Sequence, residues 1–327
     1  MKVYLTFDVE VWCNNWAELD QRFPAAFERY VYGRSAHGDY ALPATLQILQ
    51  RHGLRGVFFV EPLFAARFGS EFLERIVQMI RGAGQDVQLH LHPEWTDEIR
   101  PPLLADISRK RQHLSYYSVD EQTQLIAYAK QALQAAGAGE VSAFRAGSYA
   151  ANAATYEALR RNTIAIDSSL NELDGNSGQG IPTLAQPASH RMVGGVHTYP
   201  ITVFQDGFGQ LRPAQIGACS FSELCEAMDF AQANGCGHFV VVSHNFEMLQ
   251  PDRSIPDWVV VRRFERLCAY LAANTHRFDV GAFSIATQTT RPEQRPRTSK
   301  WATTVRWAEQ IQRRLPLVNF GARPIHG

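Results

Sequence analysis

The sequence predicts an α/β fold, with a parallel sheet or barrel at the centre and helices on its outside. Two observations predict it. Short apolar segments typical of buried strands alternate along the chain with amphipathic helical segments. In addition, polar side chains follow several of these strands, at the ends where parallel α/β proteins place their active sites.

The first strand is expected over residues 2–10, because apolar and polar residues alternate there. Asp8 and Glu10 fall on the polar face, near the end of the strand. Carboxylates at the end of a buried strand are costly unless they are paired or bind a metal. They can also cap a following helix, so this strand alone does not decide between the two roles.

The next elements have clear start and stop signals. Residues 12–40 are rich in aromatic side chains and too long for a simple loop, so we expect them to cover the mouth of a site. Pro43 and Gly53 delimit one helix, and Ser70 and Gly82 delimit another. The expected helices cover 44–52, 70–81, 118–136, 152–161, 220–235 and 258–273. The expected strands after the first cover 56–60, 87–92, 141–144, 164–167, 196–203, 238–243 and 281–285.

The strand over 87–92 carries two histidines. His90 and His92 alternate with apolar residues and therefore share one face, and Pro93 ends the strand. Two imidazoles at a strand end can bind one divalent metal ion. An isolated His-x-His pair is more often two exposed histidines, but the matching polarity of Asp8 and Glu10 favours the metal hypothesis.

Polar residues of interest share one location, the C-terminal ends of predicted strands. Parallel α/β proteins hold their active sites at that edge, so we expect these residues to meet. They are Asp8, Glu10, His90, His92, Arg145, Asp167 and His244.

Composition limits the classes of function. The chain has 327 residues, no formal net charge and 45% hydrophobic residues, which allows one large or two ordinary domains and gives no reason to expect nucleic acid. Its five cysteines form no Cys-x-x-Cys pair, which indicates reduced thiols in the cytosol. A strand from Lys2 is not compatible with a signal peptide, and no run is apolar enough to cross a membrane. We therefore expect a cytoplasmic protein.

The tail, residues 291–327, differs from the rest. It holds eight Lys or Arg and two Glu, a formal net charge of +6. Its apolar residues fall near helical spacing with arginines between them, as in helices that lie on anionic membranes. The alternatives are a helix packed against the barrel and a frayed end. The apolar residues are Trp301, Val305, Ala308, Ile311 and Leu315.

Five segments, in this order, resemble the motifs of the polysaccharide deacetylase family, also called the NodB-homology or carbohydrate esterase 4 group. They are Thr6-Phe7-Asp8-Val9-Glu10, Leu89-His90-Leu91-His92, Arg145-Ala146-Gly147-Ser148-Tyr149, Asp167-Ser168-Ser169-Leu170 and Val242-Ser243-His244. The family usually has Asp-Asp, His-x-x-x-His, Arg-Pro-Pro-Tyr and a tryptophan in the first four motifs. The Asp-Val-Glu and His-x-His forms resemble a divergent branch that includes deformylases of lipid-linked aminosugars.

The resemblance implies an irregular, seven-stranded (β/α) barrel of the NodB type over 1–290, with 291–327 as a basic appendage. It also implies a divalent metal, Zn²⁺ by preference, held by Glu10, His90 and His92. Asp8 would be the general base, and His244 the acid that protonates the leaving amine.

Four further residues receive roles from the same resemblance, each with a structural alternative. Arg145 would pair with Asp8, or form a surface ion pair; Asp167 would hold His244 in the right tautomer, or cap a helix. Tyr149 would offer its backbone N–H to the oxyanion and Trp95 would stack on sugar, unless both only pack.

The function implied is metal-dependent N-deacylation, either deacetylation or deformylation, of an amino sugar in a surface-polysaccharide or lipopolysaccharide precursor. The partner would be a glycan or aminosugar, nucleotide- or lipid-linked, with peripheral membrane contact through 291–327. Two alternatives stay open: a non-catalytic glycan-binding protein on the same fold, and an allantoinase-like amide hydrolase.

Overall fold

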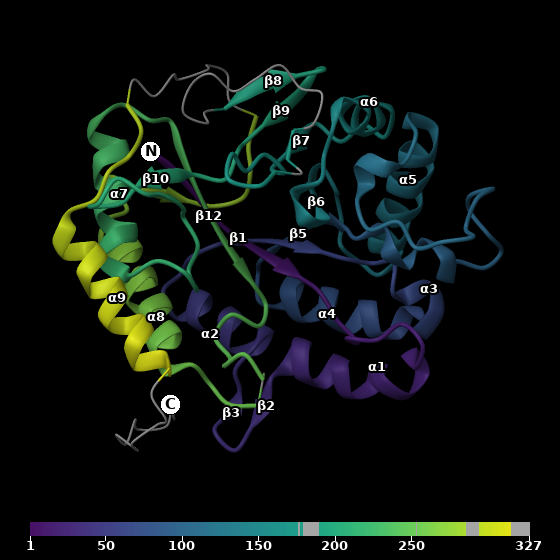
Figure 1. Cartoon of the computed structure of the whole chain (residues 1–327), viewed down its shortest axis with the longest axis horizontal. Coiled ribbons are helices and arrows are strands. Elements are labelled where there is room, and N and C mark those ends of the chain that lie inside the picture. The colour runs from purple at the N-terminus through teal and green to yellow at the C-terminus, as the bar shows by residue number, and fades with distance from the viewer. Residues whose placement is uncertain (176, 179–189, 253, 286–293, 315–327) are drawn as a thin grey trace.

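A curled nine-stranded sheet organises the molecule (Figure 1). The computed structural model describes residues 1–175, 177–178, 190–252, 254–285 and 294–314. The strand order is β12-β1-β4-β5-β6-β7-β9-β8, with β13 beside the start of β1. All pairs in this sheet are parallel except β8 with β9. The strands are β1 (Lys2–Val9), β4 (Val57–Val60), β5 (Asp86–Leu91), β6 (Ala143–Ala146), β7 (Ile166–Asp167), β8 (Arg191–Val193), β9 (Val196–Thr198), β12 (His238–His244) and β13 (Asp279–Val280).

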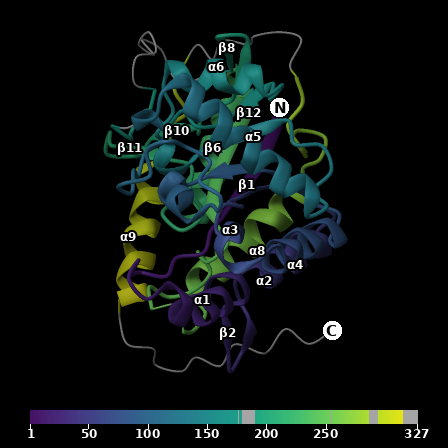
Figure 2. The same cartoon turned by 90° about the vertical axis from the view of Figure 1, so that its right-hand side faces the viewer.

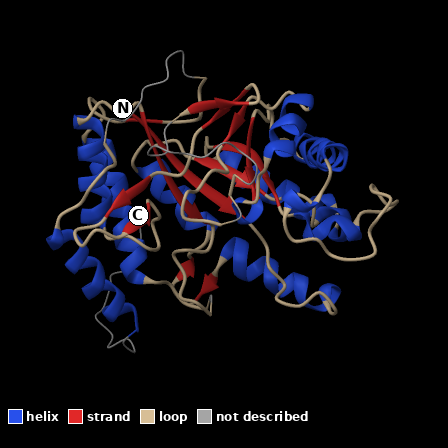
Figure 3. Ribbon diagram, turned by 45° about the horizontal axis from the view of Figure 1, so that its top comes forward, coloured by secondary structure: helices blue, strands red, loops and turns tan. Residues whose placement is uncertain are grey.

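Helices cover the outside of this sheet, as Figure 3 shows. In Figure 1, α7, α8 and α9 lie on one side, and α5 and α6 on the other. The α-helices are α1 (Leu19–Phe27), α2 (Leu42–Arg51), α3 (Ala65–Phe68), α4 (Ser70–Gly82), α5 (Val119–Ala135), α6 (Ala153–Arg161), α7 (Phe221–Ala233), α8 (Trp258–Ala273) and α9 (Lys300–Arg314). The shorter elements are the π-helical turn η1 (Glu28–Tyr32), the 3₁₀ turns η2 (Pro93–Glu98), η3 (Leu114–Tyr116) and η4 (Gly147–Tyr149), and the hairpins β2 (Arg34–Ser35) with β3 (Gly38–Asp39) and β10 (Val203–Gln205) with β11 (Leu211–Pro213).

The two faces of the sheet bury different cores. Along β1, Val3, Leu5 and Phe7 join the large apolar cluster between the sheet and the helices. Tyr4 belongs to a second, smaller cluster with residues from the concave face of β4, β7 and β12. Because side chains alternate along a strand, Asp8 then shares the concave side with Tyr4. The curl of the sheet therefore gathers the even-numbered polar side chains of β1 inside.

The barrel expected from the sequence is correct in outline, but its strand count is not. The main sheet has nine strands where the family resemblance implied seven, because the hairpin β8–β9 and the short β13 add three strands to the six others. The curl is a half-barrel, and coil crosses its open side. There, Thr202 N–H donates to Val240 O at 3.2 Å, and Val242 N–H donates to Ala214 O at 2.9 Å.

Two predicted strands need correction. The strand expected over 196–203 is divided into β9 and β10, with β10 pairing antiparallel with β11 outside the main sheet. The strand expected over 281–285 lies earlier, at β13, where Asp279 pairs in register with Lys2. Residues 12–40 contain α1, η1 and a small hairpin, and most of 171–190 lies outside the described residues.

The C-terminal helix α9 packs against α7 and α8, as Figure 1 shows, and Figure 2 shows it along the edge of the molecule. Arg306 is 1% exposed and contacts two carboxylates, Asp206 at 2.8 Å and Glu223 at 3.0 Å. Arg313 pairs with Asp257 at 2.6 Å. The described part of the tail is therefore a helix packed on the body, which was one of the alternatives. No helix in the described ranges is both long and apolar enough to span a bilayer.

Candidate active site

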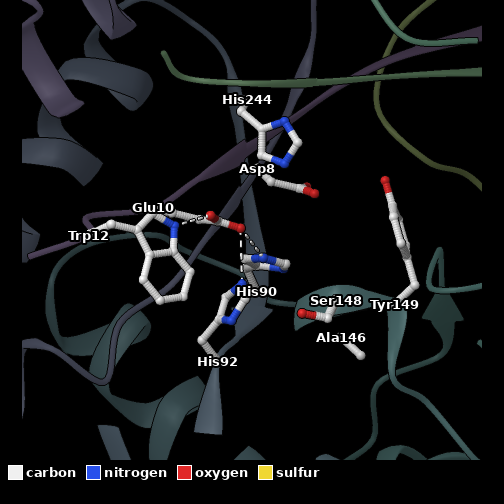
Figure 4. A pocket seen from close by; sticks show the side chains of 9 residues that line it. All are labelled: Asp8, Glu10, Trp12, His90, His92, Ala146, Ser148, Tyr149 and His244. Carbon is white, nitrogen blue, oxygen red and sulfur yellow. Dashed lines mark hydrogen bonds and ion pairs between the residues drawn. The ribbon is translucent and has the colours of Figure 1, made fainter. Parts of the chain in front are cut away.

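The C-terminal ends of β1, β5, β6 and β12 meet at one cavity of about 200 Å³ (Figure 4). Strand register explains the meeting, because Asp8 lies opposite His244 and His90 lies opposite Arg145. The cavity is lined by Asp8, Glu10, Trp12, His90, His92, Ala146, Ser148, Tyr149 and His244.

Three buried side chains point at one another inside this cavity. Glu10 Oε1 lies 2.9 Å from His90 Nε2 and 3.0 Å from His92 Nε2. The other carboxylate oxygen, Oε2, accepts a hydrogen bond from the Trp12 indole N–H at 2.6 Å. Trp12 thus holds Glu10 so that Oε1 faces both imidazoles, and these three ligand atoms form one possible metal site.

The far nitrogens of the two imidazoles also face acceptors. His90 Nδ1 lies 2.8 Å from the carbonyl oxygen of Arg145 and donates its N–H there, so the neutral imidazole would offer the lone pair of Nε2 to a metal. His92 Nδ1 lies 3.3 Å from Glu94 Oε2, within ion-pair distance but without hydrogen-bond geometry. Protein ligands of metals commonly have such outer partners, which fix the tautomer and orient the ring.

The electrostatics of this cluster favour a bound cation. Burial raises the pKa of Glu10, but the His92 and His90 imidazoles beside it hold that pKa well below its usual value. Burial lowers the pKa of His92, but Glu10 and Glu94 raise it well above the ordinary value. Without a metal, the carboxylate must be neutralised by imidazole protons. A His₂-carboxylate set with open positions fits a divalent metal such as Zn²⁺.

Asp8 lies beside this cluster and is held by a buried guanidinium. Arg145 Nη1 donates to Asp8 Oδ1 at 2.6 Å, and Arg145 is completely buried. The same guanidinium donates to Thr6 Oγ1 at 2.9 Å and to Ser168 at 3.0 Å. It therefore has almost no freedom, and it fixes the position of the carboxylate next to Glu10. The pairing of Arg145 with Asp8 agrees with the expectation from the motifs.

His244 has a partner that we did not expect. Its Nδ1 lies 3.1 Å from Oε1 of Glu247, three residues later. Glu247 is itself fixed by the Gly217 N–H at 2.6 Å and the Ser243 hydroxyl at 3.2 Å. Burial lowers the pKa of His244, but the hydrogen bond to Glu247 and the negative charges of Glu10, Glu247 and Asp8 outweigh burial and raise it to about 9. An imidazolium at this position can donate a proton from its other nitrogen.

The expected contact between Asp167 and His244 is therefore wrong. Asp167 accepts hydrogen bonds from the Tyr156 hydroxyl at 2.9 Å and from the Ser169 N–H at 3.1 Å. Its pKa is raised to about 6 by burial. The carboxylate is completely buried and fixes the turn after β7. In the sequence, the only indication that Glu247 is the partner of His244 is its position three residues later. Many loops contain a Glu at that distance from a His, so the indication is weak.

The two expected substrate-binding residues differ in outcome. Tyr149 lines the cavity, and both Ser148 and Tyr149 have left-handed backbones, with φ of 51° and 52°. Trp95 is 2% exposed and packs edge-on against Trp16, so it offers no surface to a sugar. Trp12 lines the cavity instead and meets His92 edge-on, with centroids 4.8 Å apart.

Solved structures similar to this one include polysaccharide deacetylases. A Mycobacterium smegmatis protein assigned to the polysaccharide deacetylases matches with a TM-score of 0.55 at 15% identity, over 98% of this chain and 94% of that chain. The two chains share a fold. No protein-family model and no curated protein matches the sequence.

Two weaker structural matches are described as an enzyme and a pseudoenzyme of carbohydrate esterase family 4. A family 4 carbohydrate esterase from Streptomyces lividans, in complex with acetate, matches at 15% identity and a TM-score of 0.45, over 89% of this chain and 98% of that chain. A family 4 pseudoenzyme from Bacillus anthracis matches at 14% identity and a TM-score of 0.41, over 86% of this chain and 63% of that chain.

Proposed function

We propose that the protein is a metal-dependent N-deacylase that removes an acetyl or formyl group from an amino sugar. One observation carries the proposal. A compact Glu10, His90 and His92 cluster lies in the same cavity as a buried Asp8–Arg145 pair and a His244–Glu247 pair. These are the three groups that metal-assisted hydrolysis of an amide uses: a metal site, a base and an acid.

The metal would be held by Glu10 Oε1 and the Nε2 atoms of His90 and His92. A divalent cation there, Zn²⁺ by preference, would supply Lewis acidity toward an acyl oxygen and lower the pKa of water. Trp12 and Glu94 support the proposed ligands from the side away from the metal position. Trp12 donates a hydrogen bond to Oε2 of Glu10, and Glu94 faces Nδ1 of His92.

Asp8 is the residue that we assign as general base. Its carboxylate lies at the cavity, within 4.8 Å of a Glu10 ligand atom and of His244. Arg145 holds one of its oxygens and so sets the direction of the other. A carboxylate that is held in position but does not bind the metal can accept the proton of an attacking water.

His244 is the residue that we assign as general acid. It stands on the opposite side of Asp8 from His90 and His92 in Figure 4, at the end of β12. Glu247 accepts a hydrogen bond from Nδ1 and helps to keep the imidazole protonated. The other ring nitrogen, Nε2, can then give its proton to the leaving amine, so the sugar nitrogen departs as a neutral amine.

The substrate that we propose is an amino sugar of a surface-polysaccharide or lipopolysaccharide precursor, nucleotide- or lipid-linked. The aromatic walls Trp12 and Tyr149 at the cavity suit a sugar ring. All five cysteines are free, which supports our placement of the protein in the cytoplasm. The fold shared with a polysaccharide deacetylase supports the reaction class.

Metal analysis combined with turnover tests the proposal. The purified protein is expected to hold about one divalent metal per chain and to release acetate or formate from an N-acyl amino sugar. Metal without any turnover on nucleotide- and lipid-linked N-acyl sugars would leave the glycan-binding alternative. Turnover of cyclic or linear ureides in place of sugars would favour the allantoinase-like alternative. Activity that persists in His90→Ala would refute the site itself.

A further inference from the structure

The outer face of α9 exposes apolar side chains in an unusual number. Trp301 is 70% exposed, Ile311 is 61% exposed and Trp307 is 43% exposed. Two residues of the adjacent β10–β11 hairpin extend this surface. Phe208, 48% exposed, stacks on Trp307 with ring centroids 4.8 Å apart, and Leu211 is 39% exposed. We call these five residues the α9 patch.

The helix presents this patch because its other face is occupied by polar packing. Ala302, Thr303 and Arg306 are buried against the body, and Arg306 reaches Asp206 and Glu223. Helical periodicity then turns Trp301 and Ile311 outward. The helix α9 is already folded, so binding through the α9 patch would need no change in its secondary structure.

Charge on the outer face has one sign. The exposed positions of the described helix include Lys300 but no Asp or Glu, and Arg297 just before it is also exposed. The helix's one carboxylate, Glu309, pairs with Arg263 of α8 at 2.5 Å. An anionic surface would therefore meet cations and aromatic rings, with no carboxylate from this helix to repel it.

The charge around the α9 patch argues against a second copy of the chain as its occupant. Three aromatic and two aliphatic side chains that are about half exposed offer roughly 500 Å² of apolar surface, at the upper end of what a monomer exposes. In a two-fold contact the patch of one copy would meet the same patch of the other, so Arg297 and Lys300 would face like charges. An anionic surface offers these cations opposite charge.

We propose that the α9 patch binds the surface of a lipid bilayer that contains anionic headgroups. Tryptophan prefers the boundary between water and hydrocarbon, and a helix with aromatic and aliphatic residues outward and flanking cations suits that boundary. This proposal does not depend on the proposed catalytic function. Its residues lie on α9 and the β10–β11 hairpin, and none of them lines the cavity.

Co-sedimentation of the full-length protein with vesicles tests this inference. We expect the protein to bind vesicles of phosphatidylcholine with phosphatidylglycerol more tightly than vesicles of phosphatidylcholine alone. The double variant Trp301→Ser with Trp307→Ser should reduce the partition coefficient at least tenfold. The variant Lys300→Glu should reduce it on anionic vesicles only. Point variants are preferred to removal of the helix, because removal would leave Asp206 and Glu223 without Arg306.

Tyr116→Ser is the matched control, because Tyr116 is 58% exposed but belongs to η3, which is separate from the α9 patch. It should bind vesicles like the unaltered protein. Unchanged thermal unfolding will show that each variant is folded. The proposal is overturned if the unaltered protein binds neither vesicle, or binds both equally. It is also overturned if the tryptophan variant changes only self-association, measured by analytical ultracentrifugation.

Discussion

Gly147 gives the sharpest test of the metal hypothesis, because a single methyl group added there would press on one proposed ligand. A Cβ at this position would lie 2.6 Å from both Cε1 and Nδ1 of His92. Ordinary contacts of a Cβ begin near 3.4 Å, so the ring must retreat by about 0.8 Å. The backbone of Gly147 is not left-handed, so Gly147→Ala adds steric pressure without backbone strain.

The ring has little room to retreat. Trp12 meets it edge-on on one side, and Glu94 and Glu10 contact its two nitrogens. Metal–ligand distances tolerate only about 0.2 Å, which is less than the required displacement. Disturbed supporting contacts commonly weaken metal binding by about 10–100-fold, so we expect at least that loss, or about 1.4–2.8 kcal/mol. Overpacking should also lower the free energy of unfolding by about 1–3 kcal/mol.

Metal affinity is best measured by competition with a chromophoric chelator, with unfolding of the metal-free protein followed in parallel. Two glycine controls separate the effects. A Cβ at Gly82 meets nothing within 4 Å, so Gly82→Ala should leave metal affinity unchanged. A Cβ at Gly56 would lie 3.0 Å from Phe7, so Gly56→Ala should destabilise the fold without weakening metal binding. Unaltered metal affinity in a folded Gly147→Ala protein would refute the assignment of His92 as a ligand.

Four further substitutions divide the proposed roles. Asp8→Asn should keep the metal and lose about 10²–10⁴-fold in turnover, the usual cost of a missing general base; loss of metal instead would mean that Asp8 is a ligand. Glu10→Gln should lose metal first and regain part of its activity in excess metal, as elemental analysis and rate measurements will show. The pKa of His244 is raised above its ordinary value, so the acid form persists to higher pH and activity should fall as pH rises through the raised pKa. Glu247→Gln removes the partner that raises this pKa and should move the alkaline limb of the pH–rate profile down by about 1–3 pH units. Asp167→Asn should leave that limb in place, and a shift as large as that of Glu247→Gln would restore Asp167 as the partner of His244.

Strand periodicity predicted the residues that the strands themselves position. Asp8 and His90 lie on the predicted strand faces, and they meet Arg145 at the predicted edge of the sheet. This succeeded because side-chain alternation is local and parallel pairing brings the strand ends together. The number of strands was not accessible in the same way, because the count of seven came from the family resemblance, and the three-residue β8 carries too little pattern to be distinguished from coil.

The residues that sequence analysis missed all lie after a strand has ended. Trp95 and Trp12 both follow strands that carry proposed ligands, and nothing local distinguishes the aromatic that lines the cavity from the one that packs. The difference arises from η2, which turns Trp95 toward Trp16 and away from the cavity. Glu247 has the same origin, since its position depends on Gly217 from a separate segment.

Residues on the strands and residues in the segments after them should tolerate substitution differently. Asp8 is fixed by strand pairing with His244 and Phe59 on its two sides, and His90 by pairing with Arg145, so substitution there should abolish chemistry. Trp12 belongs to a segment outside the sheet, yet its indole holds Glu10, and its ring forms a cavity wall. A substitution of Trp12 that alters the choice of substrate would therefore also disturb the Glu10 carboxylate, which we propose binds the metal. We infer that variation in substrate is easier at Tyr149, which lines the same cavity but does not contact Glu10, His90 or His92 through any hydrogen bond among the described residues.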